Sequence, residues 1–270
     1  MDYKIVALDL DGTLVNSRHE ISDKNSDILI KIQKMGCKVA IATGRPFKGA
    51  TRQAEKLKLS KFGGYIMCYN GGLIMDCSDN RIIYSRELPH EYIPEICEGI
   101  KGMDITINTY TADEIIASNS RNKYTEIEPS IVGMNLHFVD DFVKFVDFPI
   151  NKCLLTGEPE TIAKLEKIYK EQFKGRLDVF KSEAFFLELV PIGVNKGEAI
   201  TKLAEINNVD ISETMSFGDG FNDVELIKTA GMGIAMANAC PEVLNAADYV
   251  TLSNDMDGVA AGIEKFFFGK

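Results

Sequence analysis

The feature that most constrains the fold is an alternation of short apolar segments with segments of helical pattern, found at both ends of the chain. Residues 3–9 predict a buried strand that only Lys4 interrupts, and further short apolar strands are predicted at residues 38–44 and 64–70. Helical patterns separate them. Strands that are apolar along most of their length are typical of parallel sheets covered on both faces, so this alternation predicts an α/β fold.

The helical patterns in this first part have clear starting points. A helix is predicted from Ser22, which can cap it, with Ile28, Ile32 and Met35 on one buried face before Gly36 ends it. A second helix is predicted to begin at Pro46, with an apolar stripe along residues 47–57.

The middle of the chain has a different pattern. From about residue 83 to 189 the strand-like segments are longer, more polar and more alternating, which predicts an open sheet with one solvated face. The first pattern returns afterwards, in the helical segment 195–207 and the apolar segments 214–218 and 232–237. The sequence therefore predicts a Rossmann-like parallel-sheet core, residues 1–82 and 190–270, interrupted by an inserted α+β cap domain, residues 83–189.

Composition excludes several classes of protein. The chain has 270 residues, of which 45% are apolar and 26% charged, as in ordinary globular proteins. The net charge of -10, without a cluster of basic residues, argues against nucleic acid as a partner. No apolar run approaches the roughly 20 residues that span a bilayer, and the N-terminal residues lack the plan of a signal peptide. We therefore expect a cytoplasmic protein without a membrane partner, and six scattered cysteines in reduced form.

Polar residues follow the predicted core strands at the points where these strands end. In an open α/β sheet, ligands bind beyond the carboxyl ends of the strands, and the parallel sheet would bring these residues to one edge. The residues concerned are Asp9, Asp11, Gly12 and Thr13, then Thr43, Gly44 and Arg45, then Asn70, Gly71 and Gly72, and finally Gly218, Asp219, Gly220, Asn222 and Asp223. Lys196 begins the helix that leads into the strand before Gly218.

This set of side chains matches the needs of phosphoryl transfer. The carboxylates of Asp9, Asp11 and Asp219 form a cluster of hard oxygen ligands, which Mg²⁺ prefers. Thr43 and Lys196 can donate hydrogen bonds to phosphate oxygens, and the helix predicted from Pro46 adds its positive end. In phosphoryl transfer, positioning and charge neutralisation carry most of the catalysis.

The two aspartates at the end of the first strand can divide the chemistry between them. Asp9 can act as the nucleophile and form an aspartyl-phosphate. Residues two apart in an extended chain point to the same side, so Asp11 can protonate the leaving oxygen and later deprotonate the attacking water. Each motif alone has a simpler explanation, since Asp-Gly is a common turn and Lys196 could be a solvated lysine. Their occurrence together, in compatible order, favours the catalytic interpretation.

The residues resemble the four motifs of one enzyme family. Residues 9–14 (DLDGTL), 43–45 (TGR), Lys196 and 218–223 (GDGFND) are similar to the motifs of the haloacid dehalogenase superfamily of phosphatases. The roughly 100 residues between the second and third motifs resemble its Cof-type branch, which carries a type-II (subtype B) cap. The resemblance covers the whole core, and Asn70, Gly71 and Gly72 fit it.

The resemblance implies a role for each motif residue. Asp9 would be the nucleophile and Asp11 the acid and base, while Mg²⁺ would be held by the Asp9 carboxylate, the Asp11 backbone carbonyl and Asp219. This leaves the Asp11 side chain free for proton transfer, unlike the residue-based interpretation. The implied phosphate contacts are Thr43, Gly44, Lys196, Asn222 and the backbone amide of Leu10, and Asp223 would support the metal ligands.

The predicted function is a magnesium-dependent phosphatase that hydrolyses a small phosphorylated metabolite, such as a sugar phosphate or a phosphorylated cofactor. Two alternatives stay open: a phosphomutase acting on a sugar phosphate, and a low-turnover regulatory protein that binds a phosphometabolite. We expect a monomer or a weak homodimer. In the predicted cap, Arg121 and Lys123 are candidate anion contacts, although a solvated surface loop is the simpler explanation.

Overall fold

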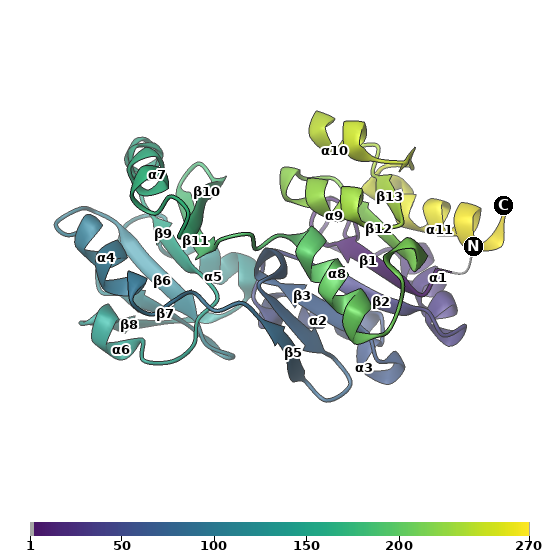
Figure 1. Cartoon of the computed structure of the whole chain (residues 1–270), viewed down its shortest axis with the longest axis horizontal. Coiled ribbons are helices and arrows are strands. Elements are labelled where there is room, and N and C mark those ends of the chain that lie inside the picture. The colour runs from purple at the N-terminus through teal and green to yellow at the C-terminus, as the bar shows by residue number, and fades with distance from the viewer. Residues whose placement is uncertain (1–2, 270) are drawn as a thin grey trace. The chain divides into compact units, whose positions relative to one another are not determined.

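The chain folds into two compact units, each with its own sheet. The computed structural model describes residues 3–269 (Figure 1). One unit combines Met1–Tyr84 with Asn195–Lys270, and the other is the inserted segment Ser85–Val194. A mainly parallel eight-stranded sheet lies in the first unit and a mixed six-stranded sheet in the second. This architecture confirms the predicted α/β fold with an inserted α+β unit.

The sheet of the first unit has the order β14-β13-β12-β1-β2-β3-β4-β5. Neighbours from β14 to β3 run parallel, and β4 runs antiparallel to β3. The strands are β1 (Ile5–Asp9), β2 (Lys38–Ala42), β3 (Tyr65–Cys68), β4 (Leu73–Asp76), β5 (Arg81–Ser85), β12 (Thr214–Gly218), β13 (Met232–Ala235) and β14 (Tyr249–Val250).

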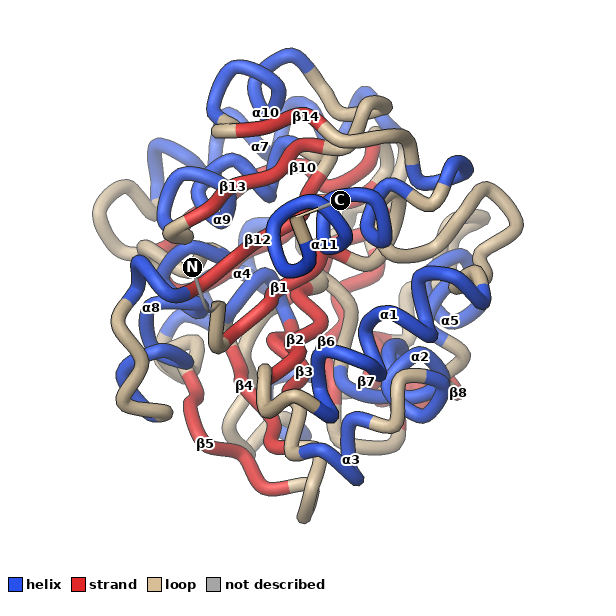
Figure 2. The backbone as a smooth tube through the Cα atoms, turned by 90° about the vertical axis from the view of Figure 1, so that its right-hand side faces the viewer, coloured by secondary structure: helices blue, strands red, loops and turns tan. Residues whose placement is uncertain are grey.

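Helices cover both faces of this sheet (Figure 2). Ile5 and Ala7 of β1 share a buried cluster with side chains of α8 and α9, and α1 packs against α11 on the other face. Since successive strand residues point to opposite faces, a strand covered on both must be apolar throughout, as β1 is. The helices are α1 (Asp23–Lys34), α2 (Thr51–Lys56), α3 (Leu59–Phe62), α8 (Lys196–Ile206), α9 (Val224–Thr229), α10 (Pro241–Ala246) and α11 (Gly258–Phe268).

Two details of the predicted helices are wrong. Ser22 caps α1 as predicted, but the helix ends at Lys34, so Met35 leaves the buried face and is 62% exposed. The single helix predicted from Pro46 is divided into a 3₁₀ turn, η1 (Phe47–Ala50), and the short helix α2. The break falls at Ala50, whose backbone has φ -120° and ψ 0°. A helix as short as α2 contributes little dipole to the neighbouring loop.

The sheet of the inserted unit has the order β10-β11-β9-β6-β7-β8 and is antiparallel except for the pair β7 and β8. Its strands are β6 (Thr106–Tyr110), β7 (Glu114–Ser118), β8 (Asn135–Val139), β9 (Cys153–Thr156), β10 (Leu177–Glu183) and β11 (Phe186–Pro191). Its helices are α4 (Tyr92–Gly99), α5 (Ile127–Val132), α6 (Phe142–Phe145) and α7 (Pro159–Gln172).

The two faces of the inserted sheet differ in polarity. Side chains of α4 and α7 pack on one face and form the apolar core of this unit, where Ile107 and Leu155 contribute from β6 and β9. The prediction that one face of this sheet is solvated is wrong for the central strands. The strands β6, β9 and β11 are buried along their whole length. One reason is that the segment between β7 and β8 supplies hydrogen-bond partners to this face, including Thr125 for Thr106.

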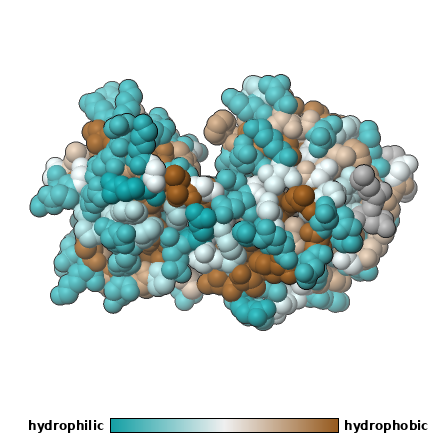
Figure 3. Space-filling view, viewed as in Figure 1, coloured by the Kyte–Doolittle hydropathy of each residue, from teal (hydrophilic) through white to brown (hydrophobic). Residues whose placement is uncertain are grey.

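One face of the molecule is mostly polar. Hydrophilic residues dominate the face of the molecule shown in Figure 3, with apolar residues in small patches between them. None of the helices that the structure describes has both the length and the apolar character needed to cross a bilayer.

Candidate active site

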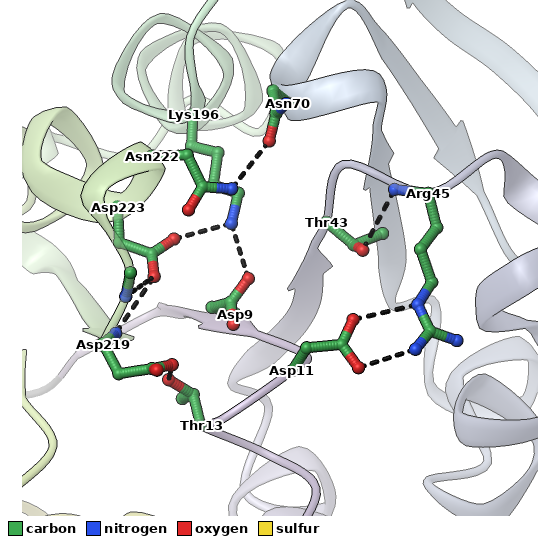
Figure 4. A network of polar contacts seen from close by, with 11 residues as sticks. Asp9, Asp11, Thr13, Thr43, Arg45, Asn70, Lys196, Asp219, Asn222 and Asp223 are labelled. Atoms are coloured by element: carbon green, nitrogen blue, oxygen red, sulfur yellow. Dashed lines mark hydrogen bonds and ion pairs between the residues drawn. The ribbon is translucent and has the colours of Figure 1, made fainter. Parts of the chain in front are cut away.

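The candidate site lies where three parallel strands end. Asp9 is the last residue of β1, and its register partner Ala42 is the last residue of β2, directly before Thr43. On the other side of β1, Leu8 pairs with Phe217 of β12, so Gly218 and Asp219 follow at the same level. The central position of β1 therefore brings three of the predicted motifs to one edge of the sheet (Figure 4).

Lys196 connects Asp9 with the motif that follows β12. It is the first residue of α8, whose start is capped by the Asn195 side chain, and its own side chain is completely buried. Lys196 Nζ donates to Asp9 Oδ1 at 2.5 Å and to Asp223 Oδ1 at 2.6 Å. A buried ammonium group between two buried carboxylates offsets part of their mutual repulsion.

Burial and charge together shift the pKa values of these groups. Burial raises the pKa of Asp9 well above its usual range, and the charge of Asp223 adds to the rise, while Lys196 opposes it. For Lys196, burial alone would lower the pKa, but the charges of Asp223 and Asp9 outweigh it, so the pKa is raised and the group stays protonated. Burial also raises the pKa of Asp219 to about 6, although a hydrogen bond from Thr13 works against this.

Asp223 fixes the loop that carries Asp219. Its Oδ2 accepts hydrogen bonds from the backbone amides of Asp219 at 3.0 Å and Gly220 at 2.9 Å. The Thr13 hydroxyl donates to Asp219 Oδ1 at 2.7 Å. With Oδ1 bound to Lys196, both oxygens of Asp223 are engaged in holding other groups.

Three carboxylates form a group that could hold a cation. Oxygens of Asp9, Asp219 and Asp223 lie within 4.8 Å of one another. Asp9 Oδ2 and Asp219 Oδ2 take part in none of the hydrogen bonds found among the described residues, so each can serve as a ligand. The residue-based expectation placed the Asp11 side chain in this group, and that expectation is wrong, because the Asp11 carboxylate is not among the clustered oxygens.

Arg45 holds the Asp11 carboxylate apart from the cluster. Arg45 Nε donates to Asp11 Oδ2 at 2.9 Å, and Arg45 Nη2 donates to Asp11 Oδ1 at 2.6 Å. The strand ends at Asp9 and the chain turns at Leu10, so the argument from an extended chain does not hold, and Asp11 points toward Arg45 (Figure 4). The sequence motif alone assigns Arg45 no separate role, although its position beside Thr43 and Gly44 is a signal.

Asn70 connects the segment that carries Thr43 and Gly44 with Asn222. Thr43 is buried, and its hydroxyl accepts a hydrogen bond from the Arg45 amide at 3.2 Å. Asn222 Nδ2 donates to Asn70 Oδ1 at 2.9 Å. A Cβ atom at Gly44 would lie 3.2 Å from the same Asn70 oxygen, so a larger residue there would crowd it.

The backbone before Gly71 is strained to place Asn70. Tyr69 and Asn70 both have positive φ, 53° and 55°, in the left-handed region that non-glycine residues rarely adopt. Such strain costs of order 1–3 kcal/mol per residue and persists where the surroundings enforce it. Asn70 is therefore a positioning residue for Asn222, a role that its place in the motif of residues 70–72 does not reveal.

The two candidate anion contacts in the inserted unit are engaged elsewhere. Lys123 Nζ pairs with Glu158 Oε1 at 2.7 Å, and the Arg121 guanidinium lies 3.7 Å from the centre of the Phe138 ring. Both contacts agree with the simpler explanation, in which Arg121 and Lys123 belong to a solvated surface loop.

Comparisons with known proteins agree with this site. A family model for haloacid dehalogenase-like hydrolases matches residues 6–263. A solved haloacid dehalogenase-like hydrolase from Bacteroides thetaiotaomicron is 40% identical, with 98% of this chain and 100% of that one covered and a TM-score of 0.93. The 5-amino-6-(5-phospho-D-ribitylamino)uracil phosphatase YcsE of Bacillus subtilis is 30% identical, with 97% of this chain and 95% of its own length covered.

A solved structure of lower sequence identity shares the whole fold, including the inserted unit. The subclass IIB sugar phosphatase BT4131 is 24% identical, with 98% of this chain and 99% of that one covered and a TM-score of 0.83. The chain belongs to the haloacid dehalogenase-like hydrolases, and it is a phosphatase of that family. The resemblance inferred from the four sequence motifs is confirmed.

Proposed function

We propose that this protein is a magnesium-dependent phosphatase that hydrolyses a small phosphorylated metabolite through an aspartyl-phosphate intermediate. The observation that supports this best is the separation of two carboxylates at the end of β1. Asp9 lies in the buried cluster beside Lys196 and Asp219, whereas Asp11 is half-exposed and paired with Arg45. Two carboxylates held apart in this way can take separate roles in one reaction.

The residues present fit a magnesium ion. The donor set consists of hard oxygens, and three carboxylates with a single buried lysine leave an excess of negative charge. The Asp9 carboxylate, the Asp219 carboxylate and the Asp11 backbone carbonyl would hold the ion, while Asp223 fixes the Asp219 loop. When bound, Mg²⁺ would neutralise charge on the transferring phosphoryl group.

The side chains then divide the reaction into two steps. Asp9 attacks phosphorus, the bond from phosphorus to the leaving oxygen breaks, and Asp11 gives that oxygen a proton. In the second step Asp11 takes a proton from water, which attacks phosphorus and releases inorganic phosphate and the Asp9 carboxylate. Lys196, Asn222, Thr43, Gly44 and the Leu10 amide would bind the phosphate oxygens.

The inserted unit is proposed to act as a cap that selects the substrate. The family relatives support a phosphorylated metabolite with a sugar-like portion, since YcsE acts on a compound with a phosphoribityl chain and BT4131 is a sugar phosphatase. A sugar phosphate or a phosphorylated cofactor precursor is therefore the proposed substrate class.

A phosphate-release screen over phosphorylated metabolites tests this function. We expect release with Mg²⁺ and loss of release when the metal is chelated. Following one hexose phosphate separates the alternatives, because isomerised sugar would indicate a phosphomutase and free phosphate a phosphatase. Tight binding of one compound without turnover of any would instead indicate a regulatory protein.

The stabilising effect of Mg²⁺ is expected to depend on pH. The pKa of Asp219 is raised to about 6, mainly by burial, so between roughly pH 4 and 6 the folded protein binds a proton that the unfolded chain releases. This contribution to stability is present at low pH and lost as pH rises through about 6, where the ionised carboxylate gains affinity for a cation. Mg²⁺ should therefore raise Tm more at pH 7.5 than at pH 5.

Thermal unfolding with and without Mg²⁺ at both pH values measures this. The variant Asp219→Asn provides the control, because it removes both the proton site and the ligand charge. Equal shifts at the two pH values, or a shift in Asp219→Asn as large as in the wild type, would contradict the proposed ligand.

Removal of the Arg45 guanidinium is expected to slow reactions that need leaving-group protonation. Arg45→Gln should lower kcat for an alkyl phosphate by about 10- to 100-fold, because a displaced proton donor loses much of its contribution. p-Nitrophenyl phosphate should be affected less, since nitrophenolate leaves without a proton. Arg45→Lys keeps the charge without the bidentate contact and should fall between. Equal loss of kcat on both substrates would show that Arg45 does not act through Asp11.

A further inference from the structure

The turn that follows the two aspartates of β1 is held by side chains from the C-terminal part of the chain. Residues 12–17 belong to no helix and to none of the sheet strands. Asn238 Nδ2 donates to the Gly12 carbonyl at 2.8 Å, and Asn254 Nδ2 donates to the Val15 carbonyl at 3.0 Å. Backbone carbonyls outside regular structure need partners from elsewhere, and these two asparagines supply them.

The Asn238 side chain is fixed at both ends of its amide group. Its Oδ1 accepts a hydrogen bond from the Asn254 backbone amide at 3.0 Å, while its Nδ2 donates to Gly12. Because one end of the amide accepts and the other donates, a single orientation satisfies both contacts. None of the four sequence motifs contains Asn238. It therefore connects the turn after β1 with a part of the chain that has no assigned role.

The segment that carries Asn238 also contacts the loop of Asp219. Residues 236–240 directly follow β13. The backbone amides at the two ends of this segment donate to the carbonyls of Gly218 at 3.0 Å and Asp219 at 2.9 Å. The segment is therefore bound to the Asp219 loop through its backbone and to Gly12 through one side chain.

Gly12 lies at the point where these contacts meet the candidate metal site. Its φ is 82°, and a Cβ atom at this position would overlap the Asp219 carboxylate. The next residue, Thr13, donates to Asp219 Oδ1 at 2.7 Å. The preceding residue, Asp11, carries the backbone carbonyl that is a proposed magnesium ligand. The orientation of the Gly12 backbone therefore affects two of the proposed ligands.

We propose that Asn238 is a positioning residue for the magnesium site, and this rests on the proposed function. By holding the Gly12 carbonyl, it keeps the Asp11 carbonyl and the Asp219 carboxylate in the arrangement that a cation requires. Outer partners of metal ligands set the orientation of those ligands, and their loss weakens metal binding. Mg²⁺ is sensitive to such changes because it demands near-ideal octahedral geometry.

Calorimetric titration of Mg²⁺ into the full-length protein without substrate tests this role. Asn238→Ala should weaken Mg²⁺ binding by about 10-fold. The variant should fold, because the Asn238 side chain is exposed. With p-nitrophenyl phosphate, the Mg²⁺ concentration for half-maximal rate should rise by a similar factor. Saturating Mg²⁺ should restore most of kcat, because it restores occupancy of the site.

Asn254→Ala is the matched control. It removes the corresponding hydrogen bond to the Val15 carbonyl but keeps the backbone amide that holds Asn238. Its Tm should change by about as much as that of Asn238→Ala, while its affinity for Mg²⁺ should stay within about twofold of the wild type.

Three results would overturn the positioning role of Asn238. They are unchanged Mg²⁺ affinity in Asn238→Ala, equal weakening in Asn254→Ala, and a kcat that stays low at saturating Mg²⁺. A wild type that binds Mg²⁺ but hydrolyses no ester would overturn the proposed function and not this role. A wild type that binds no Mg²⁺ would overturn both.

Discussion

Replacement of Asp9 by asparagine is expected to lower magnesium-dependent phosphate release by roughly 10⁴-fold or more. The amide cannot attack phosphorus and contributes no charge to the metal site. The fold should persist, because burial disfavours the charged form of Asp9. The same burial raises the pKa of its carboxyl group well above the usual range. Lys196 should keep its ion pair with Asp223, which measures 2.6 Å in the unsubstituted protein.

The loss is measured by initial rates on p-nitrophenyl phosphate together with thermal unfolding. Asp11→Asn is the informative companion, because p-nitrophenyl phosphate needs no protonation in the first step but still requires a base in the second. We expect phosphate to accumulate covalently on Asp9 in that variant, as detected by intact mass, and no such adduct in Asp9→Asn. More than one-hundredth of wild-type activity in Asp9→Asn would rule out the nucleophile assignment.

The parallel core was predictable because its strands are apolar on both faces. Burial of β1 and β2 by helices requires such residues at every position, and this requirement is visible in the sequence. The strand β5 has no counterpart among the predicted strands, because it lies at the sheet edge with exposed and half-buried residues that leave a weak pattern. The last strand, β14, also leaves a weak pattern, because it consists of only Tyr249 and Val250.

The grouping of the motifs at one sheet edge could be predicted from strand ends alone, but their contacts could not. Asp9, Lys196 and Asp219 come together as expected, while their catalytic roles stay predictions. The pairing of Asp11 with Arg45 depends on the turn at Leu10 and on side-chain direction, which residue spacing does not determine. A polar residue in an alternating strand, such as Asn108, is likewise interpreted as solvent-facing until the structure shows that it is buried.

Loss of the Lys196 ammonium is expected to have the largest effect on stability. Lys196→Met should lower the free energy of unfolding at neutral pH by about 3–5 kcal/mol, because it leaves two buried carboxylates, Asp9 and Asp223, without their shared counter-ion. Activity should fall as well, since the variant loses a phosphate contact. Denaturant unfolding with unchanged m-value measures the first effect.

A second substitution separates the lost ion pair from lost packing. Asp223→Asn in the Lys196→Met background removes one of the orphaned charges, so the double variant should be less destabilised than the sum of the two single variants by more than 1 kcal/mol, roughly the scale expected for contacting residues. Additive effects would show that the methionine disturbs packing rather than charge.

The pH dependence of the Lys196→Met deficit follows from the same charges. Without the ammonium group, Asp9 keeps the influences that raise its pKa, burial and the charge of Asp223, and loses the one that lowers it. A carboxyl group with a raised pKa stabilises the folded state while it is protonated and ceases to do so as pH rises through that pKa. The deficit relative to the wild type should therefore be smaller at pH 5 than at pH 8. A deficit of equal size at both values would mean that Asp9 and Asp223 are not the groups that Lys196 neutralises.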